Sequence, residues 1–160
     1  MKLDLTDMRI LDALQHNGKL TMKELAASMG LSITPVYERI KYLEKHNYIR
    51  KYVALIDRKK IGKEIVVFAS VTLTSHQRNM IEQFEREILP LKEVMECYHM
   101  AGVMDYLLKV CVDDMDAYQR FVVKRLAAME NISQVHSWFI LDEIKTETSV
   151  PIHIPDLSVD

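Results

Sequence analysis

The sequence contains no long apolar run and only two cysteines, and each absence argues against a class of protein. No run of 18 apolar residues occurs in the 160 residues, which argues against a membrane-spanning helix. The first residues, Met1 to Asp4, lack the apolar core of a signal peptide, so we expect a cytoplasmic protein. The two cysteines, Cys97 and Cys111, form no CxxC pair, which favours buried reduced thiols.

Catalytic and nucleotide-binding motifs are missing as well. We find no P-loop, no Rossmann fingerprint, and no Ser-His-Asp or Cys-His set that spacing brings together. The six histidines are scattered along the chain, and no pair of them is placed to bind a metal ion. The sequence therefore predicts a protein that is not an enzyme and that has no metal or cofactor.

The charge is divided unequally along an otherwise ordinary globular composition. Residues 1–60 hold 12 Lys or Arg against 7 Asp or Glu, whereas residues 61–160 hold 9 against 16. A basic first part and an acidic second part are typical of a nucleic-acid-binding module joined to a module with another role. The alternative is a chance difference between two solvated surfaces. Charge alone does not distinguish these two explanations, so the distinction rests on sequence motifs.

Three helical patterns follow one another in the basic part. The first begins at Asp4, a good N-cap, and ends near Asn17-Gly18, where we expect a left-handed stop. The second begins with a capping box formed by Thr21 and Glu24 and ends at Gly30. The third begins at Ser32 and buries a stripe at helical spacing, formed by Val36, Ile40 and Leu43.

The short turn between the second and third helices is the signature of a helix-turn-helix. The third helix carries hydroxyl groups and positive charges that suit phosphates and base edges. Residues 48–56 are mostly apolar, partly in alternation, with the basic residues Arg50 and Lys51 among them. This pattern predicts a small β wing or hinge strand. The predicted DNA contacts are Ser32, Thr34, Pro35, Tyr37, Arg39, Lys41, Arg50 and Lys51. The alternative is a three-helix bundle that packs against another protein.

The acidic part changes to a pattern of alternating strands and helices. We expect a strand, a helix, two strands, a helix and a final strand, the order of a ferredoxin-like βαββαβ domain. Helices would cover one face of its sheet, and the other face, including Phe68, Trp138 and Ile140, would stay open for a second copy. The predicted ranges are 65–74, 77–89, 94–101, 106–112, 114–129 and 135–144.

The sequence resembles a known family, the leucine-responsive/asparagine-responsive (Lrp/AsnC) transcription regulators. It is more similar to the leucine-responsive branch than to the asparagine-responsive branch. The resemblance spans essentially the whole chain, and its segments occur in the family's order and spacing. The matching segments are Leu3–Leu11, Leu31–Val36, Gly102–Val110, Met115–Phe121 and Thr146–Pro151.

The resemblance implies an α+β chain with an N-terminal winged helix-turn-helix and a C-terminal domain that senses a small ligand and forms oligomers. Its implied boundaries are residues 1–57 for DNA binding, 58–64 for a linker, 65–152 for sensing and 153–160 for a tail. It implies dimers that pair across their sheets, octamers built from four dimers, and an amino-acid effector, with leucine or a similar apolar amino acid as the first choice. The implied effector residues are Met100, Gly102, Val103, Met104, Asp105, Tyr106, Thr146 and Thr148.

The chemistry of the Gly102–Asp105 segment supports this interpretation independently. A free amino acid carries an ammonium, which the Asp105 carboxylate can pair, and a carboxylate, which backbone amides near Gly102 can bind. The alternative is a β-turn whose aspartate bonds its own backbone. At the level of function, the alternative is an architectural DNA-binding protein that senses no effector.

Overall fold

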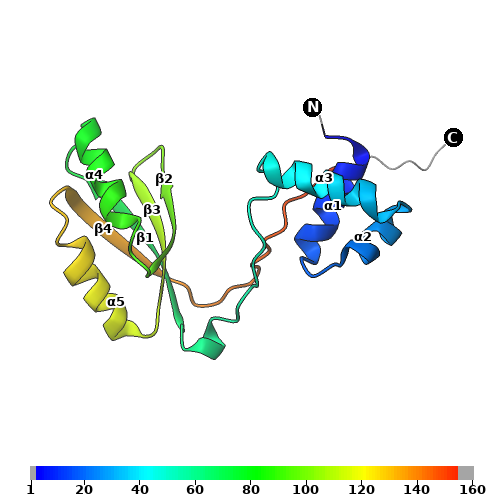
Figure 1. Cartoon of the computed structure of the whole chain (residues 1–160). Helices are drawn as coiled ribbons and strands as arrows, with labels where there is room; N and C mark the ends of the chain where they lie inside the picture. Colours follow the sequence, from blue (N-terminus) through cyan, green and yellow to red (C-terminus); the bar gives the residue numbers. More distant parts are fainter. Residues whose placement is uncertain (1–2, 155–160) are drawn as a thin grey trace. The chain divides into compact units, whose positions relative to one another are not determined.

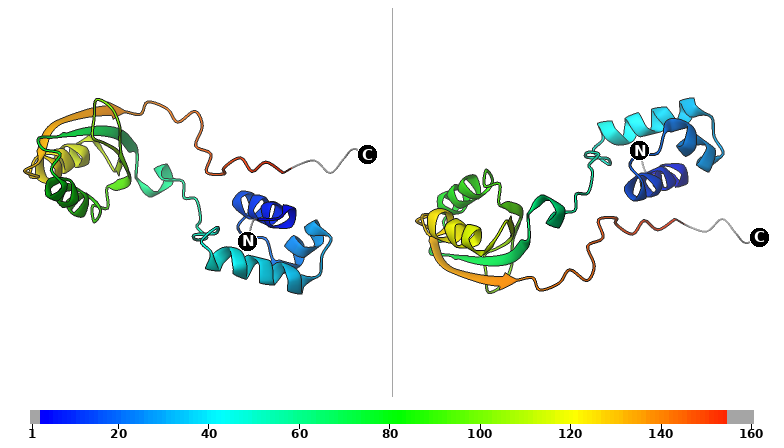
Figure 2. Two further views of the ribbon diagram at one scale, coloured as in Figure 1. Left: turned by 90° about the horizontal axis from the view of Figure 1, so that it is seen from above. Right: turned by 90° about the horizontal axis from the view of Figure 1, so that it is seen from below.

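The computed structural model describes residues 3–154. Residues 155–160, most of the predicted tail, lie outside this range. By their contacts the described residues form two compact units (Figures 1 and 2): one contains the chain up to Leu55 and the residues from Lys145 onward, the other Ile56–Ile144. The sequence-based division instead assigns residues 145–152 to the second domain. None of the helices in residues 3–154 has the length and apolarity that crossing a membrane requires.

The first unit is built on three helices, α1 (Leu5–His16), α2 (Met22–Met29) and α3 (Ile33–Lys45). Asp4 caps α1, and Thr21 forms the predicted capping box with Glu24 at the start of α2. These bonds satisfy backbone amides that no helical carbonyl can reach. The core of the unit contains the predicted stripe of α3 together with residues of α1 and α2: Ile10, Leu25, Ala26, Val36, Ile40 and Leu43.

The prediction of where a left-handed residue ends a helix of this unit is wrong. The left-handed stop is not at Asn17-Gly18, because Asn17 has a φ of −144° and its amide continues the helical bonding to Ala13. A left-handed asparagine instead follows α3, at Asn47, with a φ of 59°. There the Tyr48 amide donates to the Leu43 carbonyl over 2.9 Å, which closes the end of α3.

The wing strand predicted in residues 48–56 is not formed within the described chain. A strand needs a neighbouring edge for its amides and carbonyls, and no described segment supplies one to these residues. Several of their apolar side chains are instead exposed, namely Tyr52, Val53, Leu55 and Ile56.

The predicted linker, residues 58–64, has a defined local structure. It contains a 3₁₀ turn, η1 (Lys59–Ile61), which ends at the left-handed Gly62. The Arg58 guanidinium donates to the carbonyls of Lys63 and Glu64 and pairs with Glu143 at 2.5 Å. Arg58 therefore holds together the two ends of the second unit's chain.

The second unit has the predicted βαββαβ order. Its four strands form one antiparallel sheet in the order β2-β3-β1-β4, which confirms the ferredoxin-like arrangement (Figure 1). The elements are β1 (Ile65–Leu73), α4 (Arg78–Ile88), β2 (Val94–His99), β3 (Tyr106–Val112), α5 (Met115–Phe121) and β4 (Ile132–Phe139).

The two faces of the sheet differ because successive side chains of a strand point to opposite sides. One face carries Val67, Ala69 and Val71 of β1 and packs with Phe84 and Tyr118 of the two helices. The opposite face carries Phe68 beside Trp138, and the exposed fraction of Trp138 is 48%. The sheet is thus covered by helices on one face and open on the other, as predicted for Phe68 and Trp138.

The last helix and the last strand differ from their predicted ranges. After α5 the chain continues in a π turn, η2 (Val122–Leu126), in which the Ala127 amide donates to the Val122 carbonyl. A π turn places residue i+5 above residue i, so Phe121 and Leu126 both reach the core. The final strand runs over Ile132–Phe139, not 135–144, because its pairing with β1 extends only from Ile132, opposite Leu73, to Phe139, opposite Val67.

Candidate functional site

The first candidate site is the exposed side of α3. Gly30 ends α2 in a left-handed conformation, with a φ of 67°, and Ser32 begins the next helix two residues later. Although Ser32 occupies the N-cap position, its hydroxyl makes no capping bond, so it is available to a partner. Thr34, Pro35 and Tyr37 are also exposed. These predicted DNA contacts therefore form one surface at the beginning of α3.

Arg39 differs from the other predicted DNA contacts. Its Nη1 lies 2.6 Å from a carboxylate oxygen of Asp4 and 2.6 Å from one of Asp7. The hydrogen bonds that Arg39 donates to Asp7 and Asp4 raise the pKa of the guanidinium. The Asp7 side chain is only 3% exposed, and the sequence pattern did not identify it. Arg39 therefore ties the start of α1 to α3, and its contact with DNA stays a prediction.

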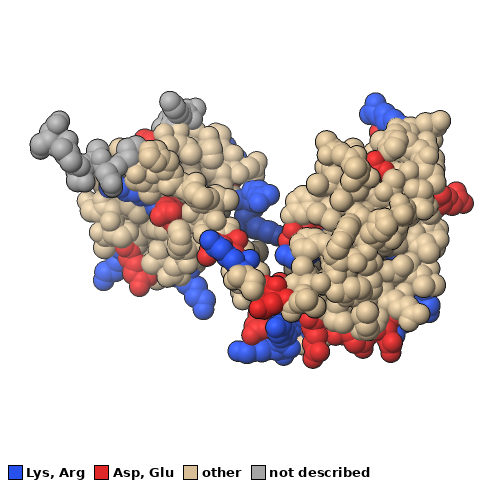
Figure 3. Space-filling model, turned by 180° about the vertical axis from the view of Figure 1, so that it is seen from behind, with Lys and Arg blue, Asp and Glu red and all other residues tan. Residues whose placement is uncertain are grey.

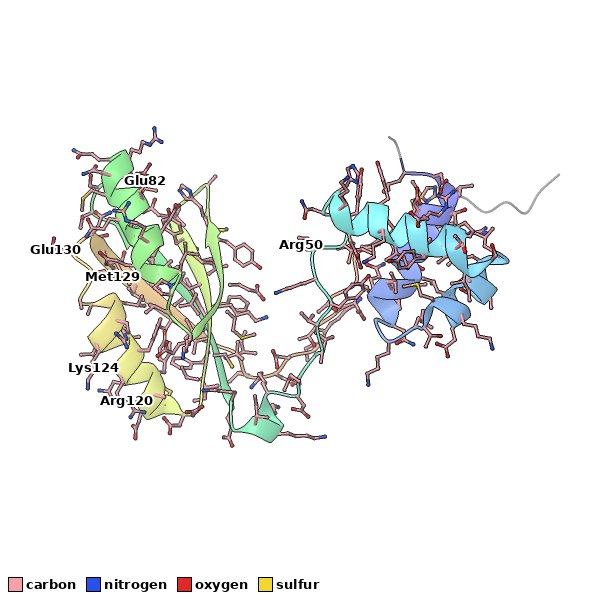
Figure 4. All side chains as sticks on the ribbon, in the orientation of Figure 1. Arg50, Glu82, Arg120, Lys124, Met129 and Glu130 are labelled. Carbon is pink, nitrogen blue, oxygen red and sulfur yellow. The ribbon has the colours of Figure 1, made fainter. Side chains whose placement is uncertain are left out.

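The remaining basic side chains are accessible. Lys41 pairs with Glu44 at 3.0 Å and lies 5.6 Å above the ring of Tyr37. Arg50 and Lys51 are exposed in the segment that follows α3 (Figure 4).

The second unit has its charges unevenly distributed. Figure 3 shows one face of the molecule, where charged side chains gather at the lower rim of the second unit and leave a broad area without charge.

The second candidate site is the hairpin between β2 and β3. The Met100 amide donates to the Asp105 carbonyl over 2.8 Å and closes the turn. Gly102 has a φ of 151°, a conformation that side chains disfavour, and the neighbouring Val103 is 94% exposed. In the described chain, the amides of residues 101–104 donate to no protein acceptor. The hairpin thus presents free backbone donors close to Asp105.

Asp105 connects this hairpin to the end of β1. One carboxylate oxygen accepts from the Leu73 amide over 2.7 Å, and the other lies 2.7 Å from Nε2 of His76. Burial alone would raise the pKa of the Asp105 carboxyl, but the bonds from Leu73 and His76 outweigh it, and the pKa lies below its ordinary value. The carboxylate is therefore ionised near neutral pH. His76 at this position was not predicted, because 29 residues separate it from Asp105.

Tyr106 and the two predicted threonines differ from the other predicted effector residues. Tyr106 is buried and donates its hydroxyl to Glu85 of α4 over 2.8 Å, while its ring stacks on His99. Burial and Glu85 raise the pKa of this phenol. Thr146 and Thr148 belong to the segment that groups with the first unit. The structure thus brings together Met100, Gly102, Val103, Met104 and Asp105, with Tyr106 as their anchor in the core.

Comparison with known proteins identifies both parts of the chain. Residues 3–50 match a model described as winged helix-turn-helix DNA-binding, and residues 66–150 match the Lrp/AsnC ligand binding domain. The chain belongs to the Lrp/AsnC family. The match to the ligand-binding domain alone covers more than half of the residues.

Individual members of the Lrp/AsnC family agree with this assignment. The Bkd operon transcriptional regulator of Pseudomonas aeruginosa is 34% identical over 94% of this chain and 99% of its own length. The leucine-responsive regulatory protein of Escherichia coli K12 is 33% identical over 94% of this chain and 92% of its own. A solved transcriptional regulator of Neisseria meningitidis, in complex with L-methionine, is 35% identical, with a TM-score of 0.89 over 94% of this chain and 97% of its own.

These relatives settle the general activity of this Lrp/AsnC chain. It is a DNA-binding transcription regulator with a ligand-binding domain. The relatives are regulators and not enzymes, in agreement with the missing catalytic motifs.

Proposed function

We propose that this regulator responds to a small amino acid that binds at the β2–β3 hairpin. The observation that carries the proposal is the ionised Asp105 carboxylate beside a turn whose amides have no protein acceptor. The carboxylate pairs the ammonium of the effector, and the amides near Gly102 bind its carboxylate. The exposed side chains of Met100 and Val103 provide apolar surface for the rest of the molecule.

The existing bonds of Asp105 leave room for this role. A carboxylate has about four lone-pair sites, and in the described chain Leu73 and His76 use two of them. The His76 side chain is 66% exposed, so it can turn aside when an ammonium approaches. Leucine or a similar apolar amino acid is the proposed effector, in keeping with the leucine and methionine named for two relatives.

We expect the replacement Asp105→Asn to abolish the response to amino acids while the fold stays intact. The amide oxygen of asparagine still accepts from Leu73, but the negative charge that pairs the ammonium is lost. A thermal-shift panel of the twenty amino acids measures the response. An effector at about 100 times its Kd stabilises the wild type by about 2.7 kcal/mol, and the variant should show no shift.

Asp142→Asn is the matched control, because it removes an exposed carboxylate of the same unit and should leave the shift unchanged. If no amino acid stabilises the wild type, the architectural alternative or another metabolite replaces this proposal. An equal shift in wild type and Asp105→Asn would place the effector elsewhere.

We further propose that DNA is contacted by the beginning of α3 and by Lys41, Arg50 and Lys51. The affinity for DNA falls with salt, and each lost phosphate contact reduces the magnitude of the slope of log K against log salt concentration by about 1. The pair Lys41→Ala/Arg50→Ala should therefore make this slope shallower by about 2 for mixed-sequence duplex DNA. The control Arg78→Ala/Arg86→Ala on α4 should leave it unchanged. Fluorescence anisotropy at several salt concentrations measures both, and equal slopes would exclude these contacts.

Self-association completes the proposal. The open face of the sheet, with Phe68 and Trp138, and the exposed apolar residues 52–56 are surfaces that monomers rarely leave uncovered. We propose a dimer that covers the sheet face and an octamer of four dimers. Light scattering on the purified chain separates these assemblies from a monomer, which would contradict the proposal.

A further inference from the structure

A cavity of about 450 Å³ lies on the helical side of the second unit, away from the β2–β3 hairpin. Its wall is formed by α5 and η2, by the end of β3, and by Lys63 and Glu93, which precede β1 and β2. Val112, Ala117 and Phe121 supply an apolar part of the lining. This volume lies within the range of small-molecule sites.

The cavity is positively charged within an acidic part of the chain. Four cationic side chains line it, against the two carboxylates Glu93 and Asp113. Lys63 neutralises Asp113 at 2.6 Å. The other three cations form no ion pair with any described residue: Arg120, Lys124 and Arg125. Because residues 61–160 carry seven more acidic than basic side chains, this local excess of positive charge is a reversal.

The π turn explains how these side chains converge. In a regular α-helix, Arg125 would lie about 140° around the axis from Arg120. The bond from the Ala127 amide to the Val122 carbonyl, 2.8 Å long, widens the turn by one residue. With the turn widened in this way, Arg125 lines the same cavity as Arg120 and Lys124. Figure 4 labels Arg120 and Lys124 on this helix. Single π turns are rare and frequently mark functional sites.

We propose that this cavity binds a small metabolite that carries phosphate groups. Arginine guanidinium groups bind phosphate oxygens with two parallel hydrogen bonds, and several unpaired cations around one hollow suit more than one negative charge. The apolar lining suits a flat apolar group such as a nucleobase. A hollow of about 450 Å³ has the size of a small-molecule site and is too small to admit duplex DNA. The site is separate from the hairpin and does not depend on the proposed amino-acid effector.

Isothermal titration of the full chain tests this site with inorganic phosphate, pyrophosphate, AMP and ATP, and with citrate as an anion that lacks phosphate. We expect at least one phosphate compound to bind the wild type, and Arg120→Gln/Lys124→Gln to weaken its binding by at least about tenfold, because the loss of even one charge-assisted hydrogen bond costs about that factor. Comparing inorganic phosphate with the nucleotides shows whether the ligand needs its organic part.

Arg78→Gln/Arg86→Gln is the matched control, since it removes the same charge from exposed positions on α4 and should change the affinity less than twofold. Four results would overturn the proposal: no binding of any phosphate compound at millimolar concentration, equal weakening in the two double variants, citrate binding as tightly as pyrophosphate, or an affinity that Arg120→Gln/Lys124→Gln leaves unchanged. The last of these would place binding elsewhere, for example on the basic first unit.

Discussion

Phe84→Ala is expected to lower the free energy of unfolding of the second unit by about 3–5 kcal/mol. Phe84 is 1% exposed, and its ring centre lies 4.5 Å from that of Tyr106. The substitution removes a large apolar side chain and leaves a cavity that the packed sheet cannot fill. Trp138 is the only tryptophan of the chain and belongs to this unit. Urea denaturation followed by tryptophan fluorescence therefore measures the effect directly.

The same helix provides a control for this prediction. Leu89 follows α4 and is 77% exposed, so Leu89→Ala should change the free energy of unfolding by less than about 0.5 kcal/mol. Because Tyr106 anchors the hairpin that carries Asp105, Phe84→Ala should also weaken the thermal response to amino acids. Equal denaturation midpoints for the Phe84 and Leu89 variants would contradict the packing described for this core.

Arg39→Ala is expected to destabilise the first unit by about 2–3 kcal/mol. Breaking a buried ion pair costs about 3–5 kcal/mol, because it leaves an uncompensated charge. Arg39 itself is 31% exposed, so we expect a smaller value. The carboxylate left behind, Asp7, is almost fully buried. Far-UV circular dichroism reports the loss of α1–α3, whereas Trp138 fluorescence follows the second unit.

Two further variants separate the ion pair from a general loss of charge. Lys45→Ala removes an exposed cation near the end of the same helix. It should leave the unfolding midpoint of the first unit, followed by far-UV circular dichroism, unchanged. In the background Arg39→Ala, replacing Asp7 by asparagine should restore part of the stability because the stranded charge is gone. An Arg39→Ala variant as stable as Lys45→Ala would show that this arginine is free for DNA, as the sequence pattern predicts.

Prediction from the sequence succeeded where neighbouring residues determine the structure. Helix caps such as Thr21 with Glu24, the turn at Gly30, and the alternating residues of β1 depend on contacts within a few positions. One local prediction, the left-handed stop at Asn17-Gly18, failed. The other failures occurred where a distant partner decides. Residues 48–56 have the composition of a strand, but no described segment pairs with them, and β4 extends only as far as its pairing with β1.

The candidate sites divide in the same way. The order of the elements, the helix-turn-helix and the Gly102–Asp105 turn were determined by the sequence alone, because periodicity, capping and glycine conformation are local properties. Only the tertiary structure showed that His76 and Leu73 contact Asp105. It also paired Arg39 with the buried Asp7. Finally, it brought three basic side chains to one cavity, namely Arg120, Lys124 and Arg125. Most of these contacts join residues far apart in sequence, and the strength of an electrostatic interaction depends on spatial distance and burial. Sequence spacing does not encode either quantity.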